Sequence, residues 1–207
     1  TVAWRVLNAY AREYATREVQ DRIYRLRAFA GIGTISDLMP LVRDNRMLVR
    51  DSLSLMRLVW ANPRPWFADT VTGSPAYSNL FKGLSCALSA FDKEHPFDTT
   101  EKIDEKFIGF SFAPTFNAAK RMGIDIGHAF NVFLGDESAR ELGMTALMEA
   151  NAERKRLVKE TLYLMDETPN PYAPVCYIVD APAGVLGLIA ARLQDMHDNP
   201  VLVVKRN

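Results

Sequence analysis

The chain has 207 residues, of which 48% are apolar and 24% charged, an ordinary composition for a globular protein with a sizeable core. Lys+Arg and Asp+Glu both number 25, and this zero net charge neither predicts nor excludes a nucleic-acid partner, because a basic groove can exist within a neutral total. Cys86 and Cys176 form no C-x-x-C pair, which argues against a cysteine zinc site and favours reduced thiols in the cytoplasm. With no long apolar run, the sequence predicts no membrane partner.

The first part of the sequence predicts helices on either side of one strand. Residues 2–28 predict mostly helix, because apolar side chains recur at three- and four-residue spacing without a proline. The apolar run at 28–36 predicts a buried strand that ends at Asp37. After Pro40 a further helix is expected, with Asp44 or Asn45 as its N-cap.

The middle of the sequence alternates loops with short elements. Proline, glycine and serine at 61–78 predict an irregular surface loop. The elements expected after it are a short helix at 81–91, a strand at 106–112, a second short helix at 127–134 and a long helix from Gly135 to Met165. This last helix has apolar ends and a polar middle, NAERKR, which is typical of a connector between two domains.

The C-terminal part predicts a compact βαβ unit. A proline-rich break is followed by a strand at 175–179, a helix at 184–197 and the strand VLVV at 201–204. A strand, helix and strand in this order imply a parallel pair. The sequence as a whole therefore predicts an α/β fold.

Asp37 is the first candidate functional residue. An aspartate after a strand is either a turn or cap residue, or a metal ligand at the carboxyl end of a parallel strand. A carboxylate suits Mg²⁺ or Mn²⁺, but one carboxylate does not make a site. His95, His128 and His197 share no i, i+4 spacing, and each is expected at the surface rather than at a metal.

Two further stretches have residues suited to phosphate. FAPTFNAAKRMG (112–123) places Asn117, Lys120 and Arg121 beside small residues, and it is equally consistent with a helix start with a basic solvated face. In DAPAGVLGLIAARL (180–193), Gly184 lies at a strand-to-helix junction, where a helix N-terminus can hold an anion. Tight helix packing is the favoured explanation for that glycine.

The order of these stretches resembles a known family. GIGTISDLMPLVRDNRMLV, IGFSFAPTFNAAKRMG, LMEANAERKRLVKE and AGVLGLIAARL with NPVLVV are similar, in this order, to segments of RecJ-type single-strand exonucleases of the DHH phosphoesterase superfamily. The resemblance implies the C-terminal part of a parallel-sheet DHH domain at 1–135, a connecting helix at 136–167 and the N-terminal part of a DHHA1 domain at 172–207.

The resemblance also implies a function. It implies a metal-dependent exonuclease that hydrolyses single-stranded DNA from the 5′ end to mononucleotides, with DNA repair and recombination as its setting. Asp37 matches a catalytic ligand of a two-metal Mn²⁺ or Mg²⁺ site whose other ligands would lie outside this chain. Asn117 and Arg121 match residues that face the DNA backbone, and Lys120 and Gly184 are expected to join them in binding substrate. A single-strand-binding protein or a helicase are further candidate partners.

Departures from the family pattern leave alternatives open. The family's D-x-D and D-H-H motifs are absent, so a fragment that is inactive by itself is expected. The family arginine after G-P is Thr115 here, a family glycine is Lys120, and a family histidine is Pro182. The alternatives are an inactive RecJ-like binding partner in DNA replication or repair, and a phosphodiesterase acting on short oligonucleotides or cyclic dinucleotides.

Overall fold

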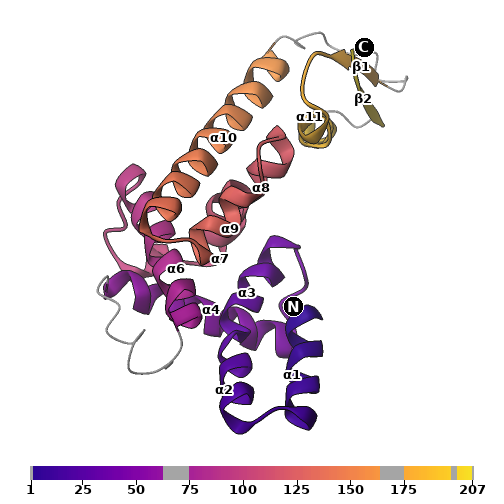
Figure 1. Ribbon diagram of the computed structural model, residues 1–207. Helices are drawn as coiled ribbons and strands as arrows, with labels where there is room; N and C mark the ends of the chain where they lie inside the picture. The colour runs from indigo at the N-terminus through magenta and orange to yellow at the C-terminus, as the bar shows by residue number, and fades with distance from the viewer. Residues whose placement is uncertain (1, 63–74, 164–174, 197–199, 207) are drawn as a thin grey trace. The chain divides into compact units, whose positions relative to one another are not determined.

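The computed structural model describes residues 2–62, 75–163, 175–196 and 200–206 (Figure 1). Its helices and strands are α1 (Val2–Tyr14), α2 (Arg17–Arg25), α3 (Arg27–Ser36), α4 (Arg43–Ala61), α6 (Pro75–Glu94), a 3₁₀ turn η1 (Thr100–Lys102), α7 (Glu105–Phe107), a π-helical stretch η2 (Ile108–Phe112), α8 (Ala113–Met122), α9 (Gly127–Leu134), α10 (Glu137–Tyr163), β1 (Val175–Val179), α11 (Ala183–Met196) and β2 (Val201–Lys205). No described helix is long and apolar enough to cross a membrane.

The chain divides into two compact units. The first unit comprises residues 1–114 and 130–144, and the second comprises residues 115–129 and 145–207. Helices α8, α9 and α10 therefore each contribute to both units. Asp37 lies in the first unit, whereas Asn117, Lys120, Arg121 and Gly184 lie in the second.

The strand predicted at 28–36 is wrong, because these residues form helix α3. The buried residues of α3 are Ala28, Gly31, Thr34 and Ile35, which recur with the period of a helix rather than alternating as in a strand. Gly31 lets α3 approach α4 closely, since a Cβ there would overlap the Leu48 carbonyl group. The apolar run is thus one face of a helix pressed against a neighbouring helix.

The strand predicted at 106–112 is also wrong. These residues continue from α7 through the π-helical η2 into α8. Phe107 and Phe112 pack their rings against Phe91 of α6, with centroids 5.2 and 5.8 Å apart. Aromatic and β-branched side chains raised the expectation of a strand, but in this chain they supply the helical core of the first unit.

The helix expected after Pro40 forms as α4, but without the predicted cap. Its N-cap is Val42, whose side chain makes no capping hydrogen bond. Asn45 instead donates from Nδ2 to the Pro40 carbonyl at 3.0 Å, and Asp44 pairs with Arg5 at 3.6 Å. Most of the loop predicted at 61–78 lies outside the described residues, and α6 begins at Pro75.

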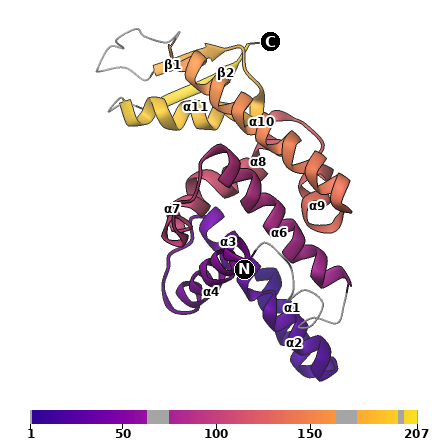
Figure 2. The ribbon, with the colours of Figure 1, turned by 90° about the vertical axis from the view of Figure 1, so that its left-hand side faces the viewer.

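The βαβ unit predicted at the C-terminal end is confirmed. β1 and β2 pair in parallel, with Val175 opposite Val201 and Val179 opposite Lys205. Helix α11 lies along this two-stranded sheet (Figure 2). The core of the second unit consists of Val179, Ala181, Val185, Ile189 and Leu193, and Met122 of α8 and Val158 and Leu162 of α10 pack against it.

The polar middle of α10 is only partly exposed to solvent. Leu147, Ala150 and Asn151 are buried on one side of the helix, and Arg154 is half-buried one turn further on. Leu142, in the expected apolar N-terminal part of the helix, is 66% exposed. A buried asparagine and a half-buried arginine thus lie within the segment that was expected to be polar, and their contacts define the candidate site.

Candidate phosphate-binding site

Helix α8 has one polar and one buried face within the second unit. Asn117, Lys120 and Arg121 follow i, i+3, i+4 spacing and therefore share a face; the first two are exposed and Arg121 is half-buried. Ala118 and Ala119 are buried on the other side. The structure thus brings together three of the predicted binding residues, with two cations among them.

Gly184 lies against the backbone of Arg121. A Cβ at Gly184 would overlap the Arg121 carbonyl oxygen and would be 2.6 Å from the Arg121 Cα, so only glycine fits. Arg121 Nη1 in turn donates to the Gly184 carbonyl at 3.1 Å. The glycine allows α11 to pack on α8 and holds the Arg121 guanidinium near the start of α11.

A hydrogen-bonded chain of three side chains lies in the same unit, and sequence reasoning did not find it. Asn151 donates from Nδ2 to Thr115 Oγ1 at 2.9 Å, and both residues are buried. Arg154 donates to Asn151 Oδ1 from Nε at 3.1 Å and from Nη2 at 2.8 Å. The sequence feature that could have indicated this contact is the spacing N-x-x-R within NAERKR, which places Asn151 and Arg154 on one face of α10.

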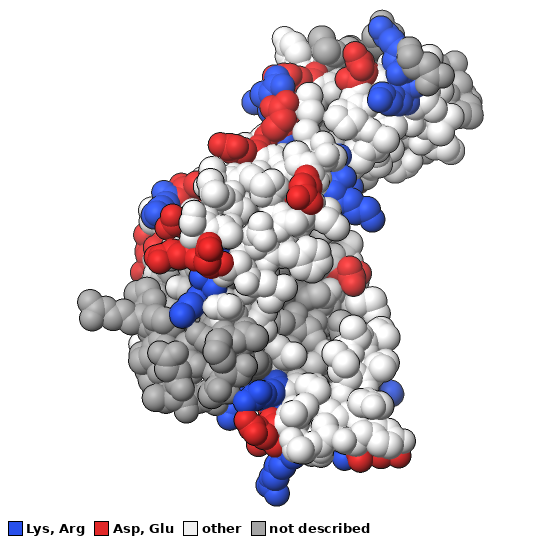
Figure 3. Space-filling view, viewed as in Figure 1, with Lys and Arg blue, Asp and Glu red and all other residues white. Residues whose placement is uncertain are grey.

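Arg154 is affected by its burial and by the nearby charge of Arg121. Burial first, and then the positive charge of Arg121, lower the pKa of Arg154. Within the described part of the chain, neither guanidinium has an ion pair with a carboxylate. Elsewhere on α10 acidic and basic side chains are interspersed (Figure 3), and Arg156 is paired with Glu153 and Glu160.

Asp37 ends helix α3 as its C-cap residue and does not end a strand. Its backbone N–H donates to the Gly33 carbonyl at 3.1 Å, and its carboxylate is exposed. Among the residues that the structure describes, no three His, Cys, Asp or Glu side chains gather as a metal site would require. The described residues therefore offer a cation the Asp37 carboxylate but not a complete site.

Of the histidines, His95 is exposed and His128 is half-buried, and neither joins such a group. His197 lies outside the described residues.

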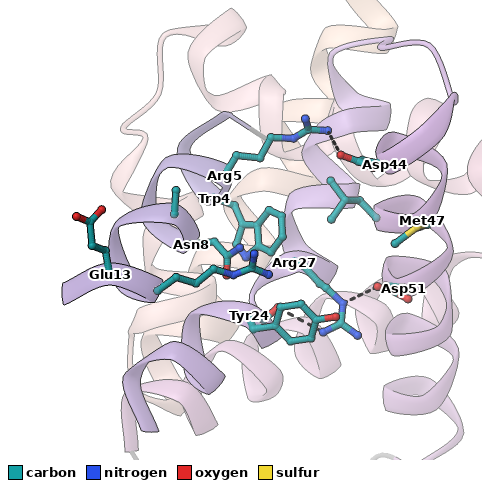
Figure 4. Close-up of a pocket in the computed structure, with 12 residues that line it drawn as sticks. Trp4, Arg5, Asn8, Glu13, Tyr24, Arg27, Asp44, Met47 and Asp51 are labelled. Atoms are coloured by element: carbon teal, nitrogen blue, oxygen red, sulfur yellow. Dashed lines mark hydrogen bonds and ion pairs between the residues drawn. The ribbon is translucent and has the colours of Figure 1, made fainter. Parts of the chain in front are cut away.

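A pocket of about 790 Å³ in the first unit was not predicted from the sequence (Figure 4). Trp4, Arg5 and Arg12 of α1 face Arg27 and residues of α4 across it. Two of its arginines are already ion-paired: Arg27 Nε lies 2.6 Å from Asp51 Oδ2, and Arg5 pairs with Asp44. The charges of these two arginines are thus offset by carboxylates, unlike those of Arg121 and Arg154 in the second unit.

The described residues form a mostly helical α/β fold with one small parallel sheet, and this fold matches that of solved RecJ structures. Two crystal structures of RecJ share it: that from Thermus thermophilus in complex with Mg²⁺, at a TM-score of 0.64 and 21% identity, and an exonuclease RecJ bound to manganese, at 0.66 and 24%. Each superposes on 87% of this chain, which covers 25% and 40% of those chains, respectively.

Sequence comparison identifies the same proteins. The chain is 28% identical over 178 residues to the single-stranded-DNA-specific exonuclease RecJ of Thermus thermophilus, and 26% identical over 201 residues to that of Haemophilus influenzae. These matches cover 84% and 90% of the chain but only 22% and 30% of the relatives, so the chain spans less than a third of their length. No protein-family model matches the chain.

Proposed function

We propose that the protein is a RecJ-like exonuclease that hydrolyses phosphodiester bonds of single-stranded DNA, and that this chain supplies part of its DNA-binding surface. The observation that supports this function best is the polar face of α8, where Arg121 and Lys120 stand together in a chain that resembles RecJ proteins along most of its length. Digestion from the 5′ end to mononucleotides belongs to the same proposal.

Asn117, Lys120 and Arg121 are assigned to the DNA backbone. Their one-sided placement on α8 gives one amide and two cations that can reach successive phosphate oxygens. Gly184 acts through Arg121, because it admits α11 close to α8 and accepts the hydrogen bond from the guanidinium. A surface of this kind binds backbone without selecting sequence.

Asp37 is assigned as one ligand of the divalent metal, Mn²⁺ or Mg²⁺, that the family resemblance implies. An exposed carboxylate with no hydrogen bond to its oxygens among the described residues is suited to that role. The remaining ligands would come from outside this chain, as the family resemblance implies, because no group of three or more His, Cys, Asp or Glu side chains gathers among the described residues. When bound, such a metal supplies an activated water and charge stabilisation at the phosphodiester.

The experiment that tests the proposal is a salt titration of single-strand binding. Full-length protein and its Arg121→Gln variant are titrated against a fluorescent oligothymidylate at several salt concentrations. The variant should bind less tightly, and the slope of log K against log salt should fall in magnitude by about 0.7, the value for one phosphate contact on a single strand. Arg192→Gln, which removes an equal charge from the exposed side of α11, is the control. An unchanged slope for Arg121→Gln would contradict the assignment.

One observation favours a second candidate, a RecJ-like binding partner without nuclease activity. Thr115, which occupies the position of a family arginine, is buried and accepts its hydrogen bond from Asn151, so it presents no cation to DNA. A nuclease assay with Mn²⁺ separates the candidates. Binding without hydrolysis would support the partner, whereas hydrolysis confined to very short oligonucleotides would support the oligonucleotide phosphodiesterase.

A further inference from the structure

We propose that Arg154 is a second phosphate-binding residue of this site, and that Asn151 and Thr115 hold it in position. The inference rests on the proposed function, since the phosphate is that of the single-stranded DNA backbone. It assigns a role to the polar segment of α10, which the comparison of sequences left without one.

The guanidinium of Arg154 is fixed along one edge. Its Nε and Nη2 both donate to the same oxygen, Asn151 Oδ1, and the Asn151 amide is itself fixed by its bond to Thr115. Asn151 and Thr115 together anchor the Arg154 guanidinium. They are only 5% and 0% exposed, so this anchor is rigid. The Nη1 edge of Arg154 makes no hydrogen bond within the described residues and is available to an acceptor.

The anchor holds the guanidinium but does not neutralise it. An asparagine oxygen accepts hydrogen bonds without supplying a negative charge. Arg156, two residues further along α10, shows the contrast: it donates to both Glu153 and Glu160, and these carboxylates raise its pKa. Arg154 is instead half-buried beside a second cation, and its pKa is lowered.

A bound anion would reduce the electrostatic cost of placing the Arg121 and Arg154 guanidinium groups near each other. The positive charge of Arg121 disfavours the charged form of Arg154, and burial of Arg154 disfavours it more strongly. A phosphodiester placed between them supplies one negative charge, which offsets one of the two positive charges, and its oxygens accept charge-assisted hydrogen bonds from two directions. Because Asn151 and Gly184 already hold the two side chains, little side-chain freedom is lost on binding.

The test compares Arg154→Gln with Arg156→Gln in the full-length protein, again by salt titration against fluorescent oligothymidylate. Arg154→Gln should weaken binding by about tenfold, which corresponds to one charged hydrogen bond, and lower the slope by about 0.7. Arg156→Gln removes the same charge from an arginine already paired with carboxylates, so affinity and slope should stay at the wild-type values.

An oligonucleotide with a neutral methylphosphonate backbone separates binding from folding. Arg154→Gln and wild type should bind it equally if Arg154 contacts phosphate, whereas a loss on this probe too would show a structural role and overturn the inference. If Arg121 and Arg154 share one phosphate, the fold-loss of affinity in the double variant should be smaller than the product of the two single fold-losses. A fold-loss equal to that product would show that they do not share a phosphate.

Asn151→Ala tests the positioning role. It should lower the salt slope as Arg154→Gln does, and it should change the slope no further when Arg154 is already glutamine; an unchanged slope in the single variant would overturn this role. If Arg154→Gln behaves as Arg156→Gln while Arg121→Gln still lowers the slope, the inference fails and the proposed function stands. If Arg121→Gln is also without effect, the proposed function itself fails.

Discussion

Two arginines on the same helix have opposite electrostatic environments. Arg156 is exposed and lies between Glu153 and Glu160, at 2.6 to 2.8 Å, so its charge is neutralised on the surface of α10. Arg154 is half-buried, bonded to an amide and coupled to Arg121. Three-residue spacing from Asn151 places the two side chains on one face of α10, so that the Arg154 guanidinium bonds an amide rather than a carboxylate.

Asp37→Asn tests the metal assignment at the residue scale. Because the carboxylate is exposed and ends a helix, the free energy of unfolding should change by less than about 0.5 kcal/mol. Hydrolysis in the presence of Mn²⁺ should fall by about 100-fold or more, since a ligand is lost. Asp21→Asn, an exposed carboxylate of α2, is the control, and near-normal turnover in Asp37→Asn would refute the assignment.

The glycine beside Arg121 gives a second prediction at this scale. Gly184→Ala forces a Cβ against the Arg121 backbone and should destabilise the protein by about 1–3 kcal/mol. Gly187→Ala, one turn further along α11, points into open space and should stabilise it by about 0.5–1 kcal/mol. Urea unfolding measures both, and the same sign for the two variants would contradict this packing.

At the scale of elements, the pairing of α3 with α4 is decided by small residues. Ser52 of α4 donates to the Ala28 carbonyl of α3, and Gly31 faces the backbone of Leu48. No side chain larger than hydrogen fits at Gly31, because the neighbouring atoms include backbone that cannot rotate away. The two glycines of GIGTIS therefore serve different ends, since Gly33 faces open space.

Gly31→Ala and Gly33→Ala distinguish the helix from the strand predicted for this segment. In the helix, alanine at 31 meets α4 and should cost about 1–3 kcal/mol of unfolding free energy. Alanine at 33 removes a flexible residue from a helix interior and should add about 0.5–1 kcal/mol. In a strand both positions would lie on the same face, so equal effects in thermal or urea unfolding would contradict helix α3.

At the scale of the whole molecule, each of the two compact units contains one cysteine. Cys86 of α6 belongs to the first unit and is half-buried, whereas Cys176 of β1 belongs to the second and is exposed. Burial, with a smaller contribution from Glu141, raises the pKa of Cys86. The two thiols therefore report separately on the two units.

Thiol labelling at pH 8 makes use of this difference. Cys176 should react at least about tenfold faster than Cys86, because a raised pKa leaves less reactive thiolate and burial limits access. Urea that opens the first unit should remove the difference. The variants Cys86→Ser and Cys176→Ser assign the two phases, and equal rates in the native protein would contradict the described burial.

Stability should also fall as pH rises above the ordinary thiol range, since the unfolded chain ionises Cys86 more readily.

The amino-acid sequence by itself determined those helices and strands whose local sequence pattern favours the same structure as their tertiary contacts. The βαβ unit at the C-terminal end followed from apolar strands separated by a glycine-bearing helix, and the long α10 from an uninterrupted helical pattern. The resemblance to RecJ proteins also came from sequence, through the order of its motifs. These features need no knowledge of distant contacts.

Only the tertiary structure decided which residues share a site and which apolar runs become helices. The segment 28–36 is apolar and glycine-rich as a buried strand would be, but its contact with α4 favours a helix over a strand. Arg154 and Asn151 looked like solvated residues because their partners, Thr115 and Arg121, lie more than thirty residues away along the chain. Such contacts depend on how helices pack, and spacing along one chain does not encode that.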